Sequence, residues 1–118
     1  MSILDFAAFA RDHLRGLKGR VALLTPSAYG RMHTPVGPGS KTGLGWGVST
    51  YRGNRASMHS GSAETFMALL LLLPDEDHAF VVVTNTAGNE AGAGTKLALQ
   101  QLGARFTTAQ VATGATAD

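Results

Sequence analysis

Apolar residues recur at helical spacing in the first and last parts of the chain. In residues 3–15 they return every three to four positions, which predicts an amphipathic helix that the preceding serine can cap and that Gly16 ends. A Thr-Pro pair at residues 25–26 is typical of a helix start, and this short helix is expected to reach about Met32. Residues 91–106 are predicted to form the last helix, with leucines as its apolar contacts.

Between these helical segments the pattern becomes that of strands. Residues 44–51 show the alternation that is typical of a strand: Leu44, Trp46, Val48 and Thr50 alternate with Gly45, Gly47, Ser49 and Tyr51. A tight turn at Gly53 is expected to return the chain into a partner strand over residues 55–59. Residues 66–73 and 79–84 are apolar at almost every position, which is typical of strands whose two faces are both covered.

The order of these elements predicts an α+β fold. Short connections favour an antiparallel sheet of about four strands, with the N- and C-terminal helices packed on one face. Nothing in the chain is then left to cover the other face, and residues 79–84 keep an unpaired edge. The length of 118 residues fits one domain over residues 1–106, and the small polar residues 107–118 are expected to form a disordered tail.

Composition excludes several classes of function. The chain has no cysteine, so disulfides, thiolate metal sites and cysteine nucleophiles are ruled out. Ten Lys and Arg against eight Asp and Glu, mostly scattered, do not favour nucleic-acid binding. The longest apolar run is far shorter than the ~20 residues that a membrane-spanning helix needs. The first residues do not form a signal peptide, so the sequence as written carries no export signal and leaves the compartment undetermined.

Two short motifs are candidates for chemistry. The Lys-Thr-Gly tripeptide at residues 41–43 follows a loop rich in Pro and Gly, and it is interpreted as a loop that enters a strand. The run of His59, Ser60, Gly61 and Ser62 is the stronger candidate. A histidine there can donate to an anionic group or to an oxygen atom, and the glycine lets a substrate approach the backbone. The alternative is a turn of small residues with an incidental histidine.

The other histidines do not predict a metal site. No two histidines have the i, i+4 spacing of a helical metal site, so neither a metal nor another cofactor is expected. His13 is interpreted as a residue on the helix surface and His78 as a residue in a turn.

Several short motifs follow one another in a characteristic order. They are Asp5-Phe6-Ala7-Ala8-Phe9-Ala10 leading into His13-Leu14-Arg15-Gly16, Met32-His33-Thr34-Pro35, Gly43-Leu44-Gly45-Trp46, His59-Ser60-Gly61, Leu73-Pro74 and Val81-Val82-Val83-Thr84-Asn85. Together they resemble the C-terminal part of serine β-lactamase-related proteins, the family of class C β-lactamases, penicillin-binding D,D-peptidases and their esterase relatives. The resemblance covers residues 3–106 and implies a partial β-lactamase/transpeptidase-like fold.

The resemblance also implies roles for the His-Ser-Gly-Ser run. In that family a His-Ser/Thr-Gly tripeptide stands where other members carry Lys-Thr-Gly. By this resemblance His59 and Ser60 would contact the substrate carboxylate or the leaving group. Gly61 would keep the strand open to the substrate, and the backbone N–H of Ser62 would form one half of an oxyanion hole. The Lys-Thr-Gly at residues 41–43, whose glycine belongs to the Gly-Leu-Gly-Trp motif, is then coincidental.

The sequence departs from the family pattern in two respects. Ser62 and residues 64–66 stand where relatives carry a further glycine and a Gly-Phe pair, and a Glu64 carboxylate near the cleft would count against an anionic substrate. The nucleophile motif Ser-x-x-Lys is absent, since no lysine has a serine three positions before it. The base motif, Tyr-x-Asn or Ser-x-Asn, is absent as well.

These observations lead to three hypotheses. In the first, the chain is a truncated or split relative that supplies the substrate wall, is inactive alone, and has as its partner an N-terminal half that carries the nucleophile. In the second, it is a non-catalytic binding module, or a homo-oligomer that assembles through the edge of residues 79–84. In the third, it is a minimal hydrolase that uses Ser57, Ser60 or Ser62 together with His59.

Overall fold

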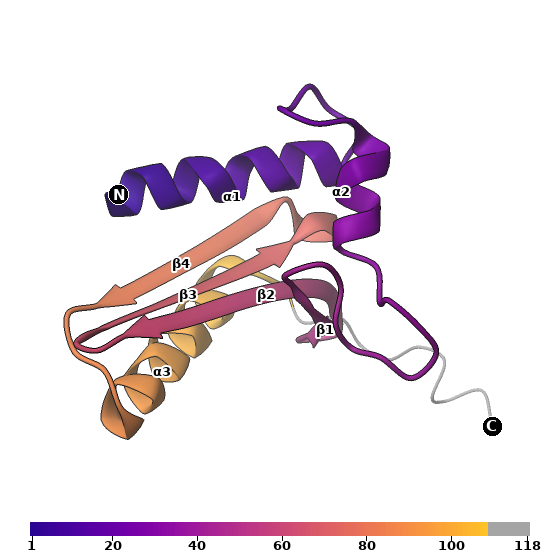
Figure 1. Cartoon of the computed structure of the whole chain (residues 1–118). Helices are drawn as coiled ribbons and strands as arrows, with labels where there is room; N and C mark the ends of the chain where they lie inside the picture. The colour runs from indigo at the N-terminus through magenta and orange to yellow at the C-terminus, as the bar shows by residue number, and fades with distance from the viewer. Residues whose placement is uncertain (109–118) are drawn as a thin grey trace.

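Residues 1–108 are described by a computed structural model in which three helices surround a four-stranded sheet (Figure 1). The elements in chain order are α1 (Ile3–Leu17), α2 (Pro26–Met32), β1 (Gly47–Tyr51), β2 (Asn54–Ala63), β3 (Phe66–Leu73), the 3₁₀ turn η1 (Pro74–Glu76), β4 (His78–Thr84) and α3 (Asn89–Phe106). The strand order is β1-β2-β3-β4, and every neighbouring pair is antiparallel. The predicted α+β class, with about four antiparallel strands and helices at both ends, is confirmed.

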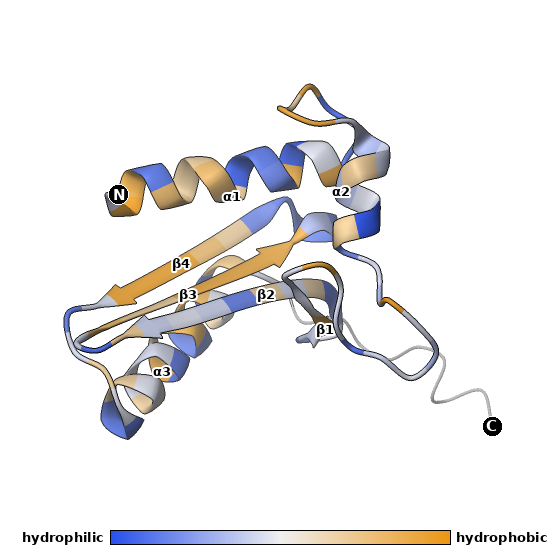
Figure 2. Cartoon of the chain, viewed as in Figure 1, coloured by the Kyte–Doolittle hydropathy of each residue, from blue (hydrophilic) through white to orange (hydrophobic). Residues whose placement is uncertain are grey.

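The two long helices cover opposite faces of the sheet (Figure 1), which corrects the prediction that they share one face. On one face Leu70 and Leu72 of β3 pack in the cluster that contains Leu14 of α1. On the other face Leu71 packs in the cluster that contains Leu99 of α3. Because successive side chains of a strand point to opposite faces, an unbroken leucine run needs a cover on both sides. Figure 2 shows this concentration of hydrophobic residues along β3 and β4.

Local side-chain bonds explain where the first helices begin. The Ser2 hydroxyl accepts a hydrogen bond from the Asp5 amide at 3.1 Å, and the Asp5 carboxylate accepts one from the Ser2 amide at 2.8 Å. The pKa of Asp5 is lowered, because its carboxylate accepts hydrogen bonds from the Ser2 amide and from the Ser2 hydroxyl, the latter at 2.9 Å. Thr25 caps α2 by accepting from the Ala28 amide at 3.2 Å, with proline at the first helical position as predicted.

Gly16 lies inside α1 rather than at its end, which corrects the predicted boundary. The helix continues to Leu17, and Gly16 is buried against the ring of Tyr29 from α2. A β-carbon at this position would collide with that ring, so the glycine allows α1 and α2 to approach closely.

The first hairpin differs in length from the prediction. Its turn at Arg52 and Gly53 has positive φ at both residues, 51° and 81°, as in a type I′ turn. β1 begins only at Gly47, and β2 continues to Ala63, beyond the predicted end at residue 59. β1 pairs with β2 only as far as Met58. The last part of β2 therefore has β3 as its only strand neighbour within residues 1–108.

β4 forms one edge of the sheet. It pairs with β3 on one side, and no strand of residues 1–108 pairs with the other side. After α3, Thr107 bonds back to the Gly103 carbonyl, and the Thr108 carbonyl accepts from Asn54 Nδ2 at 3.2 Å. The rest of the expected tail, residues 109–118, lies outside the described residues. Among the helices of residues 1–108, none combines the length and the apolar character that a bilayer crossing requires.

Candidate functional site

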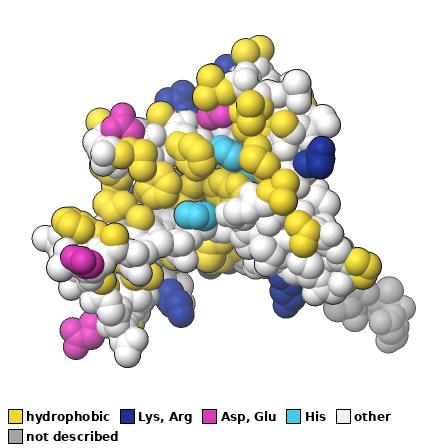
Figure 3. Space-filling view, viewed as in Figure 1, with side chains coloured by type: hydrophobic (Ala, Val, Ile, Leu, Met, Phe, Trp, Pro, Cys, Tyr) yellow, Lys and Arg dark blue, Asp and Glu magenta, His cyan; other side chains and the backbone are white. Residues whose placement is uncertain are grey.

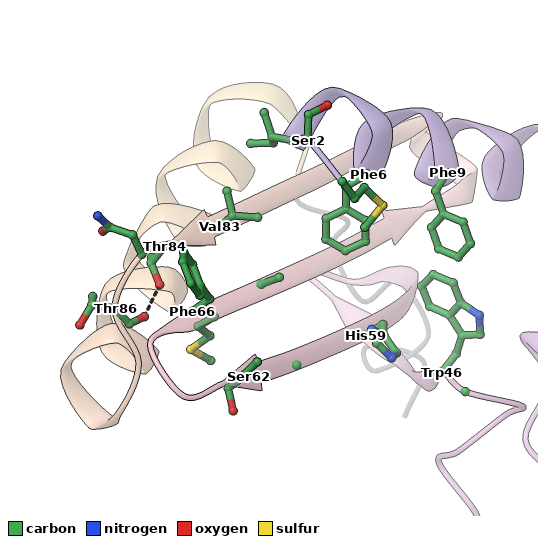
Figure 4. Close-up of a pocket in the computed structure, with 18 residues that line it drawn as sticks. Ser2, Phe6, Phe9, Trp46, His59, Ser62, Phe66, Val83, Thr84 and Thr86 are labelled. Atoms are coloured by element: carbon green, nitrogen blue, oxygen red, sulfur yellow. Dashed lines mark hydrogen bonds between the residues drawn. The ribbon is translucent and has the colours of Figure 1, made fainter.

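A groove of about 1390 Å³ lies over the sheet beside the N-terminal half of α1 (Figure 4). Its floor is formed where Gly61 of β2, Ala68 of β3 and Val83 of β4 lie side by side in register. Gly61 has no side chain and Ala68 only a methyl group, and a β-carbon added to Gly61 would meet no atom within 4 Å. The space above the sheet is therefore open at this point.

Aromatic rings form the walls of the groove. Phe6 and Phe9 come from α1, and Trp46 comes from the loop before β1. The rings of Phe9 and Trp46 are nearly parallel, with an interplanar angle of 8° and 6.2 Å between their centroids. The His59 ring lies 6.0 Å from the Trp46 ring. Figure 3 shows hydrophobic side chains gathered on this face between α1 and the sheet.

Backbone bonds of the loop before β1 hold Trp46 in place. The Trp46 carbonyl accepts from the Gly43 amide at 2.7 Å, and the Leu44 amide donates to the Met32 carbonyl at 2.9 Å. Gly43 is buried where a β-carbon would collide with the Met32 carbonyl oxygen. The Lys-Thr-Gly tripeptide at residues 41–43 is thus part of a loop that leads into β1, as interpreted.

The structure divides the predicted His-Ser-Gly-Ser run between the two faces of the sheet. His59 and Gly61 line the groove. Ser60 pairs with Leu69, which belongs to the core under α3. Ser62 pairs with Met67, whose sulfur lies 3.9 Å from Thr95 Oγ1 of α3.

Because opposite residues of an antiparallel pair share a face, both hydroxyls point to the α3 side. Ser62 still borders the groove, and Figure 4 shows its hydroxyl directed away from the α1 phenyl rings.

No described residue completes a nucleophile with a base in the groove. His59 is exposed, and within residues 1–108 no hydrogen bond joins it to a serine hydroxyl. Ser57 pairs with Leu72 on the α1 side of the sheet and is buried, with 3% of its surface exposed. Glu64 lies in the β2–β3 turn at φ 48° and is not a lining residue of the groove, although the adjacent Ala63 is.

His13 is buried in a bonded pair with His33, which corrects its interpretation as a surface residue. His13 Nδ1 lies 2.9 Å from His33 Nε2, where α1 meets the end of α2. The Trp46 ring packs 4.9 Å from the ring of His13 and 4.4 Å from that of His33. Sequence periodicity offered a signal for this burial, because position 13 adjoins the apolar stripe that contains Ala10 and Leu14.

Burial governs the protonation of both rings. It lowers the pKa of His33 to about 4, and the neighbouring His13 and Arg55 act in the same direction. Burial also lowers the pKa of His13, against the opposing effect of Asp12. His33 Nδ1 is buried and has no hydrogen-bond partner. Neutral imidazoles are therefore the stable forms in this cluster.

Two further polar contacts organise this end of the molecule. The Tyr29 hydroxyl donates to the Asp12 carboxylate, which also accepts from the Leu23 amide at 3.0 Å and so ties α2 and the preceding loop to α1. His78 is the first residue of β4 and pairs with Leu73, which corrects its interpretation as a turn residue; its Nδ1 lies 2.6 Å from the Glu76 carbonyl.

Residues 1–108 contain no group of three or more His, Cys, Asp or Glu side chains placed to hold a metal ion. Comparisons with models of protein families, with curated proteins and with solved structures found no match.

Proposed function

We propose that this chain is the C-terminal part, or one half, of a split serine β-lactamase-like hydrolase. It supplies the substrate wall of an acyl-transfer cleft and lacks the nucleophile and the general base. The observation that carries this proposal is the open groove along the end of β2, beside a strand edge that no described strand covers. No described serine in that groove contacts a base, so the chain alone is inactive.

The exposed end of β2 suits the binding of an acyl group. Alternate backbone groups of residues 59–63 point away from β3, where β1 does not reach. Such N–H groups are the donors that stabilise negative charge as it develops on a carbonyl oxygen under attack. The Ser62 amide and the His59 imidazole are the donors that we assign to this wall. The hydroxyls of Ser60 and Ser62 take no part, because they lie on the other face.

The edge of β4 is the docking site that we assign to the missing N-terminal half. The strand His78–Thr84 contains no Lys, Arg, Asp, Glu or Pro, and such residues are what protect exposed edges in other proteins. A strand from the N-terminal half would extend the sheet here and bring its nucleophile over the groove.

The same edge supports a second candidate, a non-catalytic module that assembles with a second copy or binds an extended peptide. Sedimentation velocity tests it. Val83→Lys places a charge on the edge strand and is expected to reduce dimer formation, whereas Leu97→Lys on the exposed face of α3 should leave it unchanged. A wild-type chain that stays monomeric at high concentration excludes self-association.

The leading proposal is tested with a fluorescent penicillin and a chromogenic acetate ester. The chain alone should form no covalent adduct and should hydrolyse the ester no faster than buffer does. Addition of a separately produced N-terminal half, with Ser-x-x-Lys and Tyr-x-Asn motifs, should generate hydrolysis that Gly61→Leu abolishes. A labelled serine in the isolated chain, with activity lost on its replacement by alanine, would overturn the proposal in favour of a minimal hydrolase.

A further inference from the structure

We propose that the groove binds an uncharged apolar group, such as the aromatic or branched acyl part of an ester, and discriminates against ligands that carry a carboxylate. The proposal rests on the proposed function only in taking this groove as the acyl-binding wall. Three features of the described residues support it, namely an unfilled floor, aromatic walls and the absence of Lys, Arg, Asp and Glu side chains from the lining.

The floor is shaped to receive a side-chain-sized apolar group. Gly61 has no side chain and Ala68 has only a methyl group, although β3 carries Leu70 and Leu72 under α1. A β-carbon at Gly61 would stand in open space. The hollow is thus a consequence of residue size at these positions, and a larger side chain at Gly61 would fill it without displacing the protein.

The walls offer aromatic surface that remains exposed to water. Phe9 of α1 is 46% exposed and Phe66 at the start of β3 is 61% exposed, and both line the groove. Figure 4 shows Phe6 and Phe9 directed from α1 toward the sheet, with Trp46 beside Phe9. Covering these rings with an apolar ligand would remove their surface from water, which is the main driving force for binding in such a site.

The electrostatic surroundings favour a neutral ligand. No Lys, Arg, Asp or Glu side chain lines the groove. Two of the arginines are engaged elsewhere, Arg20 with Asp77 and Arg55 with Asp75, each at 3.3 Å. A carboxylate moved into this groove would lose hydration without gaining a Lys or Arg side chain as its partner, and that loss opposes binding.

Polar groups on the rim suit a single neutral oxygen. Thr84 Oγ1 already donates to the Thr86 carbonyl at 2.6 Å, and His59 borders the groove at its other end. Because the single hydrogen of the Thr84 hydroxyl is already used, a ligand carbonyl would accept its hydrogen bond from His59 while the remainder of the ligand stays among the rings. This pattern of an apolar interior with few polar groups is typical of small-molecule sites.

The single tryptophan makes the proposal directly measurable, because Trp46 forms part of the wall. N-phenyl-1-naphthylamine, a neutral apolar probe, should bind saturably to the full chain and accept energy from Trp46. At pH 7.5 methyl phenylacetate should displace it at a concentration at least tenfold lower than phenylacetate. Gly61→Leu should weaken probe binding at least tenfold. The matched variant Gly94→Leu, at an exposed position of α3, should leave it unchanged.

Each other result overturns the proposal. Equal or better displacement by the carboxylate would show that charge is tolerated, and unchanged binding by Gly61→Leu with a native circular dichroism spectrum would place the probe elsewhere. Probe binding that scales with dimer content would show that a second copy forms the site. These outcomes are separate from the penicillin test above, since labelling of a serine contradicts the split-hydrolase proposal whatever the ligand preference of the groove.

Discussion

Acidification from pH 7.5 to 4.5 is expected to destabilise this fold through the buried His13–His33 pair. A histidine in an unfolded chain titrates near pH 6.5, whereas burial lowers the pKa of His33 to about 4 in the fold. Between these values the unfolded chain binds a proton that the folded chain does not bind. The contribution of His33 to the free energy of unfolding is therefore greatest above pH 6.5. It decreases as the pH falls from 6.5 to about 4, and below pH 4 His33 causes no further loss.

The size of the effect follows from the two pKa values of His33. Their difference, from 6.5 to about 4, corresponds to about 3 kcal/mol. The pKa of His13 is lowered as well, which adds to the effect in the same direction. A small domain has a total stability of ~5–15 kcal/mol, so the loss is a large fraction of it. Asp5 contributes outside this window, because its lowered pKa places its titration below 3.8.

Urea unfolding followed by Trp46 fluorescence measures this loss, since the Trp46 ring lies 4.4 Å from the ring of His33. The wild-type midpoint should fall steadily from pH 7 to pH 4.5. In His33→Phe the acid-dependent loss should shrink to the part that His13 contributes. At pH 7.5 this variant should be about 1–2 kcal/mol less stable, because His13 Nδ1 loses its partner.

The exposed His59 provides the matched control for this prediction. His59→Gln should keep the wild-type dependence on pH, because that ring is exposed and outside the pair. Asp12, Tyr29 and Arg55 are the other titratable groups that face the pair, and they are present in both variants. Equal slopes for the wild type and His33→Phe between pH 6.5 and 4.5 would refute the assignment of the acid response to these histidines.

Three substitutions test the local packing, each measured by urea unfolding. Gly16→Ala should cost about 1–3 kcal/mol, because its methyl group collides with the Tyr29 ring and separates α2 from α1. Gly43→Ala should cost a similar ~1–3 kcal/mol and alter Trp46 fluorescence, since the new methyl group meets the backbone that holds this loop. Ser2→Ala removes the capping box of α1 and should cost about 1 kcal/mol, with reduced helical circular dichroism.

Gly94→Ala is the control for the two glycine substitutions. Its β-carbon would meet no atom within 4 Å in the middle of α3, so alanine should stabilise the helix by about 0.5–1 kcal/mol. A loss of stability comparable to that of Gly16→Ala would show that alanine destabilises these helices without a collision, and would contradict the assignment of the Gly16→Ala loss to the Tyr29 ring.

Several elements could be predicted because their causes are local. β3 spans residues 66–73 as expected, since an apolar run ends at Pro74 and the preceding turn is polar. α2 likewise begins after Thr25 and ends at Met32, as its cap and proline indicate. Capping, turn chemistry and strand propensity depend on residues within a few positions, so the linear order contains the necessary information.

The candidate site was only partly accessible from the sequence. The sequence indicates the run from His59 to Ser62 as a candidate site. Strand alternation alone predicts that its two serines lie on one face of the sheet, and that His59 and Gly61 lie on the other face. The aromatic walls were not predicted, because they combine α1 with the loop that carries Trp46.

By itself, the sequence determined the elements of this protein, their order and the small residues that leave the groove open. Only the tertiary structure decided that α1 and α3 lie on opposite faces of the sheet and that His13 meets His33 across α1 and α2. Periodicity states that a side chain is buried but not what buries it. That choice depends on contacts between residues far apart in the chain, which are selected by the packing of the whole core.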